Sequence, residues 1–411
     1  MQGDGMNILF LTLVNISGFE EQQNIYADQC RELVRRGHRV HIVCPDEIGA
    51  DTAFLPYQEG SGVLKVRTGQ VQKTSLIRKG IATLTLGACF KKAIKKHLKG
   101  HKYDLVMYST PPITLVNIVK YVKKRDGAKT YLLLKDIFPQ NAVDLGMMAK
   151  KGLKAPIYWY FRKMEQKLYA ISDRIGCMSQ ANVDYIKAHE PQIPADSIHV
   201  SPNAFEPQTI CISVEQKKQL RQKYGLPEEK KVFIYGGNLG RPQGVPFLVE
   251  CLKEVSSLDD CYFVICGRGT EFGTLDAYAV KENQKNLKVI PGLPRKEYED
   301  FVGCCDVGLI FLDHRFTIPN FPSRLLSYMQ KSMPVIACTD PVSDVGKVIE
   351  EGNFGLWCES DDPKKFARAV MELCQKDLPA LGENAASYLK THYSVQRVAD
   401  VILEEYTGVR V

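Results

Sequence analysis

A possible phosphate-binding site begins at Pro322, where Ser323 and Arg324 follow directly. Pro322 suits the first turn of a helix, because that turn loses no amide donor. The residues after Arg324 place apolar side chains on one helical face, and Pro334 ends the pattern. Residues 335–338 are short and apolar, which is typical of a buried parallel strand. The helix start would present free amides, the Ser323 hydroxyl and the Arg324 guanidinium together. This combination predicts a phosphate-binding site.

A second candidate for phosphate binding is a glycine-rich turn that follows the strand-like residues 231–237. Its glycines allow the backbone to approach a ligand closely, and Arg241 supplies a cation. We expect Arg241 and Arg324 to share the neutralisation of a phosphate-bearing ligand. An arginine-bearing turn without a ligand is the simpler alternative. The residues of this turn that we place in the candidate site are Gly237, Asn238, Arg241 and Gly244.

Asp136 is a candidate acid–base residue, because it follows the strand-like residues 130–134. Ligands bind at the carboxyl ends of the strands in an open parallel sheet. Lys135 stands beside Asp136 and is expected to favour its carboxylate form. Such a carboxylate can accept a proton from a hydroxyl group. A helix cap or a hydrogen-bonded structural aspartate is the alternative interpretation.

Two further strand ends carry residues that suit the edge of a ligand site. Gly18, Phe19 and Glu20 follow the first predicted strand, where a plain strand-to-helix turn is the alternative. Arg268 follows a later strand and stands between two glycines. Its side chain contacts phosphate in one interpretation and is simply solvated in the other.

These residues need a scaffold that brings strand ends together. Strand patterns alternate with helical patterns along the 411 residues, which predicts an α/β fold with doubly wound parallel sheets. The alternation restarts after residue 204, so we expect one domain over residues 1–208 and a second over residues 209–391. A helical pattern at residues 23–36 is one example of the intervening helices. The predicted strands cover residues 8–14, 40–44, 104–108, 130–134, 174–178, 231–237, 262–266, 287–290, 307–311 and 335–338.

Composition excludes several classes of protein. Hydrophobic residues make up 45% and charged residues 25%, as in a soluble globular enzyme. No apolar run reaches the ~18 residues that a membrane-spanning helix needs. No basic region precedes the apolar residues 6–14, as it would in a signal peptide. The 13 cysteines are scattered without metal-ligand spacing, which favours buried, reduced thiols in a cytosolic protein.

Positive charge is concentrated in the first half of the chain. Residues 1–205 carry 29 Lys and Arg against 18 Asp and Glu, whereas the remainder carries 25 against 29. This imbalance predicts an anionic partner for the first half. Two basic runs with apolar and aromatic neighbours, residues 91–102 and 150–163, fit docking on anionic lipid headgroups, and a solvated helix face is the alternative. Nucleic acid is not expected, because no binding motif accompanies the charge. The lysines that we expect to face a membrane or acceptor are Lys91, Lys92, Lys95 and Lys96.

The segment that Pro322 opens resembles the donor site of retaining family-4 glycosyltransferases, which have the GT-B fold. In that fold two Rossmann-like domains face each other across a cleft. Residues 233–244 resemble the family's pyrophosphate loop, and residues 134–140 resemble its acid–base segment. The resemblance covers nearly the whole chain in order. It implies that Ile290 lies in the loop whose backbone contacts the nucleotide base, and that a last helix, about residues 392–411, packs back on the first domain.

Several positions depart from the pattern of the resembled family. Two glutamates that the family usually carries fall at Pro319 and Ser327, so Ser327 would hydrogen-bond the ribose in place of a glutamate. Asn238 and Gln243 replace an arginine and a lysine of the pyrophosphate loop. The residues expected to bind phosphate therefore match the family pattern more closely than those expected to contact the ribose and the sugar.

The resemblance implies a retaining hexosyl or N-acetylhexosaminyl transferase that uses a UDP-linked sugar donor. The first domain would hold the acceptor, a lipid-diphosphate-linked glycan for a bacterial capsule, O-antigen or exopolysaccharide. No cofactor and no metal are expected. The protein would work in the cytoplasm, on the inner face of the membrane. A UDP-sugar epimerase of GT-B architecture and a non-catalytic, transferase-like binding subunit are the alternatives.

Overall fold

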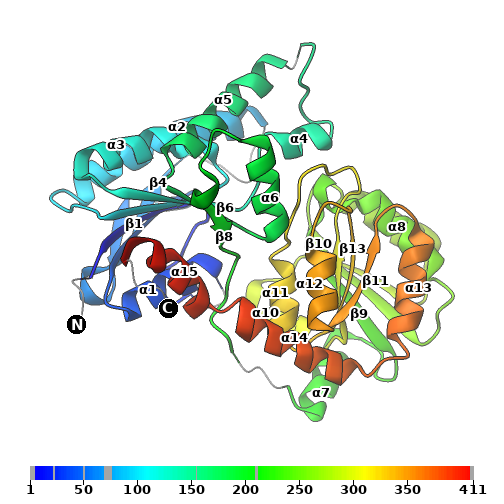
Figure 1. Ribbon diagram of the computed structural model, residues 1–411. Coiled ribbons are helices and arrows are strands. Elements are labelled where there is room, and N and C mark those ends of the chain that lie inside the picture. Colours follow the sequence, from blue (N-terminus) through cyan, green and yellow to red (C-terminus); the bar gives the residue numbers. More distant parts are fainter. Residues whose placement is uncertain are drawn as a thin grey trace. The chain divides into compact units, whose positions relative to one another are not determined.

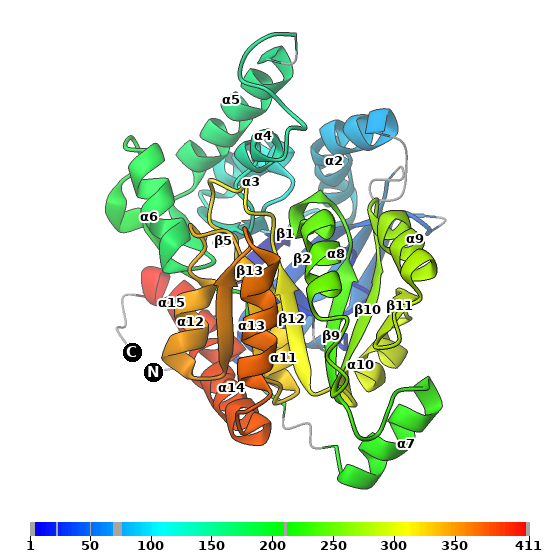
Figure 2. The same ribbon diagram turned by 90° about the vertical axis from the view of Figure 1, so that its right-hand side faces the viewer.

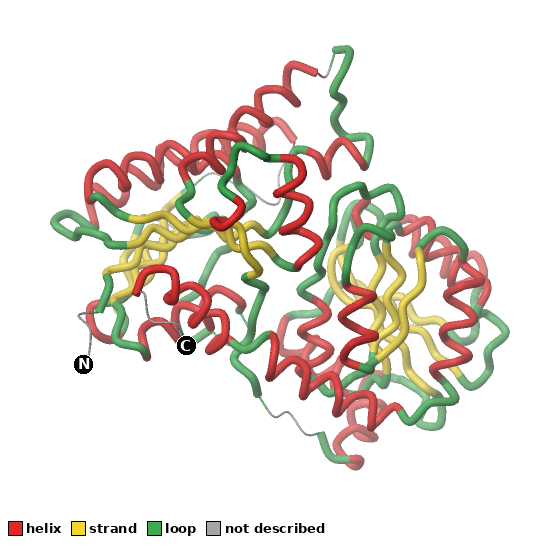
Figure 3. The backbone as a smooth tube through the Cα atoms, viewed as in Figure 1, coloured by secondary structure: helices red, strands yellow, loops and turns green. Residues whose placement is uncertain are grey.

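The computed structural model describes residues 5–21, 24–49, 51–68, 76–153, 155–208 and 212–407, with the side chains of residues 76–84, 405 and 407 excepted. The chain divides into two compact units. Unit 1 comprises Met1–Glu206 and Tyr393–Val411, and unit 2 comprises Pro207–His392. Each unit contains one sheet with helices on both faces (Figure 3). The prediction of an α/β fold with two such sheets is confirmed.

Unit 1 is built on an eight-stranded sheet in the order β3-β4-β2-β1-β5-β6-β7-β8. The β3–β4 pair is antiparallel and the other pairs are parallel. The chain order reverses between β1 and β5, which makes their carboxyl ends the switch point where ligands bind in such sheets. The strands are β1 (Asn7–Leu11), β2 (Arg39–Asp46), β3 (Ala53–Pro56), β4 (Gly62–Arg67), β5 (Leu105–Ser109), β6 (Lys129–Leu134), β7 (Arg174–Cys177) and β8 (Ile198–Val200).

The first strand is shorter than the sequence pattern predicts. The predicted strand extends to residue 14, whereas β1 ends at Leu11. The chain turns at Thr12, whose hydroxyl oxygen accepts a hydrogen bond from the N–H of Val14 at 3.1 Å and another from the O–H of Ser109 at 3.1 Å. Apolar side chains at 13 and 14 therefore extend the strand pattern beyond the strand itself.

Helices cover both faces of the sheet of unit 1. In Figure 1, α1 and α15 lie on one face, and α2, α3 and α5 lie on the other. Asn24 begins α1 by accepting the N–H groups of Tyr26 and Ala27 on its side chain, which satisfies two free amides of the first turn. The helices of unit 1 are α1 (Ile25–Arg35), α2 (Leu76–His97), α3 (Val116–Asp126), α4 (Gln140–Asp144), α5 (Ala155–Ile171), α6 (Gln180–His189) and α15 (Val395–Thr407).

The C-terminal helix α15 belongs to unit 1, although the chain reaches it only after unit 2. Val395, Val398 and Ile402 are buried in the apolar core that α1 and the sheet also line. At the surface, Arg36 and Asp400 form an ion pair at 2.5 Å. Residues 408–411 of the predicted last helix, and residues 209–211 at the predicted domain boundary, lie outside the described residues.

Unit 2 is built on a six-stranded parallel sheet in the order β11-β10-β9-β12-β13-β14. This is the order of a dinucleotide-binding sheet, with its switch point between β9 and β12. Figure 2 shows α8 and α9 on the flank of this sheet. The strands are β9 (Lys231–Asn238), β10 (Cys261–Arg268), β11 (Leu287–Pro291), β12 (Val307–Phe311), β13 (Val335–Thr339) and β14 (Gly355–Glu359).

The helices of unit 2 connect successive strands and close the core. Leu248 and Leu252 of α8, with Phe366 and Val370 of α13, pack on the same face of the sheet. None of the helices in the described residues of either unit is long and apolar enough to cross a membrane. The helices of unit 2 are α7 (Val214–Tyr224), α8 (Val245–Glu254), α9 (Phe272–Glu282), α10 (Arg295–Gly303), α11 (Arg324–Gln330), α12 (Val345–Gly352), α13 (Pro363–Leu373) and α14 (Leu378–His392).

The cysteines in the described residues are free, and most of them are buried, as predicted. Cys89 and Cys374 are the two that are partly exposed, and Cys211 lies outside the described residues. Cys338 and Cys358 are neighbours on β13 and β14, with their sulfurs 3.2 Å apart. These thiols serve as small apolar side chains of the core.

The two central strands of unit 2 separate at the switch point, and a tyrosine fills the gap. Pairing between β9 and β12 stops after Gly308 and Ile234. Beyond it, the buried Tyr328 hydroxyl lies 3.0 Å from the carbonyl oxygen of Ile234 and 3.3 Å from that of Leu309. It also accepts the N–H of Gly236 at 3.3 Å. Tyr328, on α11, therefore provides hydrogen-bond partners for backbone groups that have none in the other strand once β9 and β12 separate.

Replacing Tyr328 with phenylalanine is expected to lower the free energy of unfolding of unit 2 by about 1–3 kcal/mol, because buried backbone groups lose their partner. Urea unfolding of the full chain measures this. Tyr298→Phe is the matched control, since the Tyr298 hydroxyl has no hydrogen-bond partner in the described residues. That control should change stability by less than about 0.5 kcal/mol. Equal effects of the two changes would contradict the role of the Tyr328 hydroxyl.

Candidate active site

The glycine-rich turn of unit 2 lies at the carboxyl end of β9, at the switch point of the sheet. Gly237 has φ +123° and Gly244 has φ +57°, values that favour glycine at both positions. The Gln243 side chain folds back into the turn, where its oxygen accepts from the Asn238 amide at 2.8 Å and from the N–H of Gly240 at 3.1 Å. Gln243 therefore fixes the turn rather than adding a cation to it.

Arg324 lies against this turn. It is the first residue of α11, and its guanidinium carbon is 4.3 Å from the centroid of the Tyr235 ring, in a cation–π contact. A side chain on Gly237 would meet the end of the Arg324 guanidinium, which shows how closely this arginine approaches the turn. Tyr235 itself is fixed, because its hydroxyl donates to the Asn238 carbonyl at 2.7 Å. The arginine of the second motif and the glycines of the first therefore form one site.

The charge of Arg324 is not neutralised by any carboxylate in the described residues. Burial disfavours the charged guanidinium, but the surrounding tyrosines outweigh it and the pKa of Arg324 is raised. Burial also raises the pKa of Tyr298 and of Tyr328, so both phenols stay neutral. A half-buried arginine that remains charged without an acidic partner is suited to binding an anion.

The helix that carries Arg324 begins later than predicted. Ser323 precedes α11 in a turn and is exposed, and its side chain makes no capping hydrogen bond. The helix is only seven residues long. Ser327, on the next turn, is half-buried. The side chain of Arg324, more than the start of the helix, therefore supplies the charge at this position.

The other predicted residues of this site differ in their surroundings. Arg241 is exposed at the tip of the turn and makes no ion pair with the described residues. Arg268, at the end of β10, donates to the carbonyl of Gly292, so it is not simply solvated. That bond ties the β10 end to the loop after β11, the edge strand on which Ile290 is half-buried.

Sequence reasoning missed a charged pair at the end of β12. Asp313 is buried, and Arg315 binds it with two hydrogen bonds, from Nε to Oδ1 at 2.8 Å and from Nη2 to Oδ2 at 2.7 Å. Burial would raise the pKa of Asp313, but Arg315 outweighs it and the pKa is lowered. The N–H of Asp313 also donates to the Pro242 carbonyl at 3.0 Å, which joins this strand end to the glycine-rich turn. The rule that strand ends bind ligands could have found this pair.

In unit 1, Asp136 lies just after β6 and is half-buried. Both of its carboxylate oxygens accept from the Asn141 amide nitrogen, each at 2.8 Å. Burial raises the pKa of Asp136 to about 6, against the opposing effect of these hydrogen bonds. A carboxylate with this pKa can take up a proton near neutral pH, as a general base must.

The expected effect of Lys135 on Asp136 is wrong. The two side chains diverge, because Lys135 donates to the Ser201 carbonyl at 3.2 Å while Asp136 binds Asn141. Burial lowers the pKa of Lys135 to about 7, so its own charge is weakened. Each of these two neighbours in sequence therefore has its own partner, and they do not pair with one another.

The loop after β1 contributes less than the sequence predicts. Phe19 is buried and stacks on Tyr57, with ring centroids 4.5 Å apart, so its side chain belongs to the core. Glu20 is exposed, and Gly18 has open space where a side chain would stand. Only these two residues of the predicted three have room to face a ligand.

The four lysines of α2 lie on a helix end whose apolar side chains face inward. Phe90, Ile94 and Leu98 are buried. Lys91 and Lys95 lie 4.5 Å and 5.2 Å from the centroid of the Tyr121 ring. Among the described side chains of α2, this surface is therefore basic, without exposed apolar groups beside the charges.

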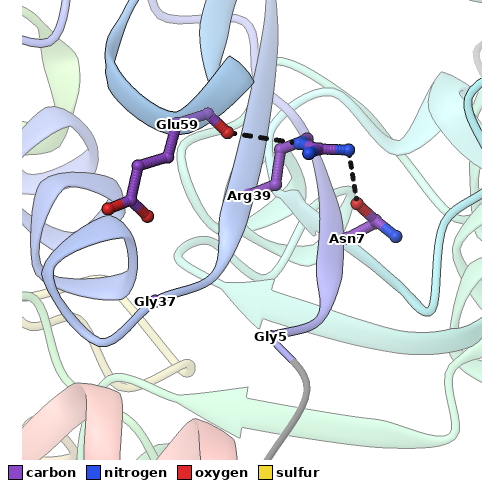
Figure 4. Close-up of a pocket in the computed structure, with 5 residues that line it drawn as sticks. All are labelled: Gly5, Asn7, Gly37, Arg39 and Glu59. Carbon is purple, nitrogen blue, oxygen red and sulfur yellow. Dashed lines mark hydrogen bonds between the residues drawn. The ribbon is translucent and has the colours of Figure 1, made fainter.

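A surface pocket of about 360 Å³ lies in unit 1, at the end of the sheet opposite to the carboxyl ends of its parallel strands. Figure 4 shows Arg39 between Asn7 and Glu59, with Nε donating to the Glu59 carbonyl at 3.2 Å. The pocket lies at the amino ends of β1 and β2, whereas ligands of such sheets bind at the carboxyl ends. It is therefore not part of the candidate site.

The chain belongs to the family-4 glycosyltransferases. Residues 22–209 match the family described as Glycosyltransferase Family 4, and residues 216–389 match Glycosyl transferases group 1. The probable glycosyltransferase WbjE of Pseudomonas aeruginosa is 25% identical over 324 residues, 78% of each chain. The putative colanic acid biosynthesis glycosyl transferase WcaI of Escherichia coli is 21% identical over 250 residues, 61% of this chain and 60% of that protein.

A comparison with solved structures supports the same fold. HepE of Anabaena, solved in complex with UDP and glucose, superposes with a TM-score of 0.68 at 15% identity, over 98% of this chain and 100% of that one. The fold is the GT-B fold, with one Rossmann-like sheet in each unit. The resemblance inferred from the sequence motifs is confirmed.

Proposed function

We propose that this glycosyltransferase binds a UDP-linked sugar on unit 2 and transfers the sugar, with retained anomeric configuration, to an acceptor hydroxyl. One observation carries the donor assignment. Arg324 remains charged, lacks a carboxylate partner in the described residues, and lies against the glycine-rich turn at the switch point of the sheet. A diphosphate supplies the negative charge that this arrangement needs.

The leaving diphosphate explains how Arg324 would promote transfer. Negative charge develops on the diphosphate as the bond to the sugar breaks, while positive charge develops on the sugar ring. A guanidinium already oriented by Tyr235 stabilises that charge without reorganisation. The exposed Arg241 adds a second cation. The family and the UDP complex of HepE support UDP as the carrier.

Unit 1 is proposed to bind the acceptor. Asp136 would accept the proton of the acceptor hydroxyl, since its raised pKa makes it a better base than an exposed aspartate. Elsewhere in unit 1, Ser201 Oγ and Asn203 Oδ1 are buried polar atoms without a partner in the described residues. Such atoms are expected to find one in a ligand or in ordered water.

A lipid-diphosphate-linked glycan fits the proposed acceptor best. The excess of positive charge lies in the half of the chain that forms unit 1. WcaI is named a putative colanic acid biosynthesis glycosyl transferase, and this relative supports a role in polysaccharide assembly. We infer the same broad role here, at the inner face of the cytoplasmic membrane.

A thermal-shift screen against nucleotides and nucleotide sugars tests the donor assignment. We expect UDP and at least one UDP-sugar to raise the melting temperature, because a ligand that binds only the folded state stabilises it. The nucleotide sugars that raise the melting temperature are then tested as donors in transfer assays with lipid-linked acceptors. A response to another nucleoside diphosphate with none to UDP would reject UDP as the carrier.

The pH dependence of transfer is expected to report Asp136. The carboxylate form is the base, and its pKa is about 6, so kcat/KM should rise with pH through a midpoint near 6. The rate is lost below that midpoint because Asp136 becomes protonated. A pH–rate profile on a fixed donor and acceptor measures this. A profile that is flat from pH 5 to 8 would argue against Asp136 as the base.

A further inference from the structure

A basic and apolar arm projects from unit 1 between α4 and α5. We define the docking arm as residues 147–153 and 155–163, which form the loop after α4 and the first half of α5. Figures 1 and 2 both show this segment extending beyond the rest of unit 1. Its N-terminal end follows α4, the short helix that carries Asn141 and so holds Asp136.

Large apolar side chains are exposed together on the docking arm. Five of the twelve such side chains that are exposed in the described residues belong to it. Leu153 is fully exposed, and Trp159 is 52% exposed. The five residues are Met147, Leu153, Ile157, Trp159 and Tyr160. A cluster of this kind on one projecting element marks an interaction surface.

The charge of the docking arm is entirely positive. Residues 147–163 contain five Lys and Arg and no Asp or Glu. Lys150, Lys151 and Lys163 are exposed and form no ion pair in the described residues. Farther along α5, Glu165 is turned inward, where it binds Arg162 and accepts from the Tyr169 hydroxyl at 2.8 Å. The outer surface therefore presents cations and apolar groups without compensating acids.

Contacts at its base hold the docking arm to the candidate acceptor side. Arg162 joins Glu165 of α5 to Glu190, the residue after α6. Phe161 packs edge-to-face on Phe138, with centroids 5.1 Å apart. Phe138 lies two residues after Asp136. Whatever the arm binds is therefore held near the proposed base.

We propose that the docking arm binds an anionic membrane surface. Its lysines would contact lipid phosphates, while Leu153, Ile157 and Trp159 enter the interface between headgroups and acyl chains. A soluble partner that carries only acidic groups would leave these apolar side chains exposed to water. A neutral partner would leave the lysines without an anionic group to contact. The inference deepens the proposed function, since it rests on an acceptor that is anchored in lipid.

Trp159 provides a direct measurement of this docking. The chain has two tryptophans, and the other, Trp357, donates to Thr339 in unit 2. A Trp357→Phe variant of the full chain therefore reports Trp159 alone. On vesicles of phosphatidylglycerol and phosphatidylethanolamine its emission should shift to the blue, and the protein should co-sediment. Vesicles of phosphatidylcholine, and high salt, should weaken binding on the order of tenfold or more.

Paired substitutions locate the surface. Lys150→Gln with Lys151→Gln should weaken binding on the order of tenfold, and Leu153→Ser with Ile157→Ser should do so without changing charge. The matched control, Lys92→Gln with Lys96→Gln, removes the same charge from α2, where none of the described side chains beside it is apolar and exposed. That control should have a clearly smaller effect and leave the emission shift of Trp159 unchanged, so it also tests the expectation that the lysines of α2 face the membrane.

Three outcomes would overturn the docking inference. The first is that the protein does not bind vesicles at low salt. The second is that the arm variants bind vesicles as well as the unchanged protein does. The third is that the protein forms dimers that depend on the arm, as seen by sedimentation velocity, and does not bind vesicles. The last would mean that a second copy covers the arm. Calorimetry with UDP separates this inference from the proposed function. A chain that binds vesicles but not UDP rejects only the donor assignment, and one that binds UDP but not vesicles rejects only the docking arm.

Discussion

Replacing Arg324 with alanine is expected to weaken UDP binding by about 2–4 kcal/mol, which is roughly thirtyfold to a thousandfold in the dissociation constant. The reason is that Arg324 is the most buried of the cations in the candidate donor site, where a diphosphate would be poorly hydrated. Its orientation over Tyr235 is also fixed before any ligand binds. Isothermal calorimetry with UDP measures the change directly.

Arg241→Ala is the matched control for Arg324. It also removes an arginine side chain from the candidate donor site, but from an exposed position on the glycine-rich turn, and should cost about 1 kcal/mol or less. Arg324→Lys should fall between the two, because it keeps the charge and loses the planar fork that grips phosphate. Melting curves of all three variants verify folding. Unchanged UDP affinity in folded Arg324→Ala protein would remove Arg324 from the donor site.

Replacing Asp136 with asparagine is expected to slow transfer by about a hundredfold to ten-thousandfold, the usual contribution of a positioned general base. Asparagine keeps the shape of the side chain but cannot accept the hydroxyl proton. UDP affinity should stay the same, because the residues proposed to bind UDP lie on unit 2. Initial rates at saturating donor, with calorimetry on the same protein, measure both quantities.

A second variant, Asn141→Ala, tests whether the pH midpoint of transfer belongs to Asp136. It removes the amide that donates to both carboxylate oxygens, so the pKa of Asp136 should rise further and the pH midpoint of transfer should move upward. Such a shift would assign the midpoint to Asp136. Asp136→Asn protein with the full rate at every pH would show that another group accepts the proton.

Much of the scaffold could be predicted from the sequence, because buried parallel strands form short apolar runs. The predicted strand at residues 307–311 is β12, and the one at residues 335–338 is β13 less its last residue. Strands β3, β4, β8 and β14 were missed. Strand β3 is mostly exposed at the antiparallel edge, and the buried run of β4 is interrupted by Lys65. Strand β8 is only three residues long, and β14 is largely half-buried.

The site was less predictable than the scaffold, because its key contacts join distant parts of the chain. Arg324 and the glycine-rich turn were each found by their local pattern, but the ring of Tyr235 beneath the guanidinium was not. Tyr235 stands inside an apolar strand, where an aromatic residue normally indicates core packing. Likewise Lys135 and Asp136 are adjacent in sequence yet have different partners, and only the fold reveals this.

The central claim is that the chain transfers a sugar from UDP to an acceptor with retention. The measurement that tests it most directly is NMR analysis of the products formed from a panel of UDP-sugars, with and without lipid-linked acceptors. We predict that UDP is released only when acceptor is present, and that the new linkage keeps the anomeric configuration of the donor. Conversion of the UDP-sugar without acceptor would instead indicate an epimerase, and an inverted linkage or no reaction across the panel would contradict the claim.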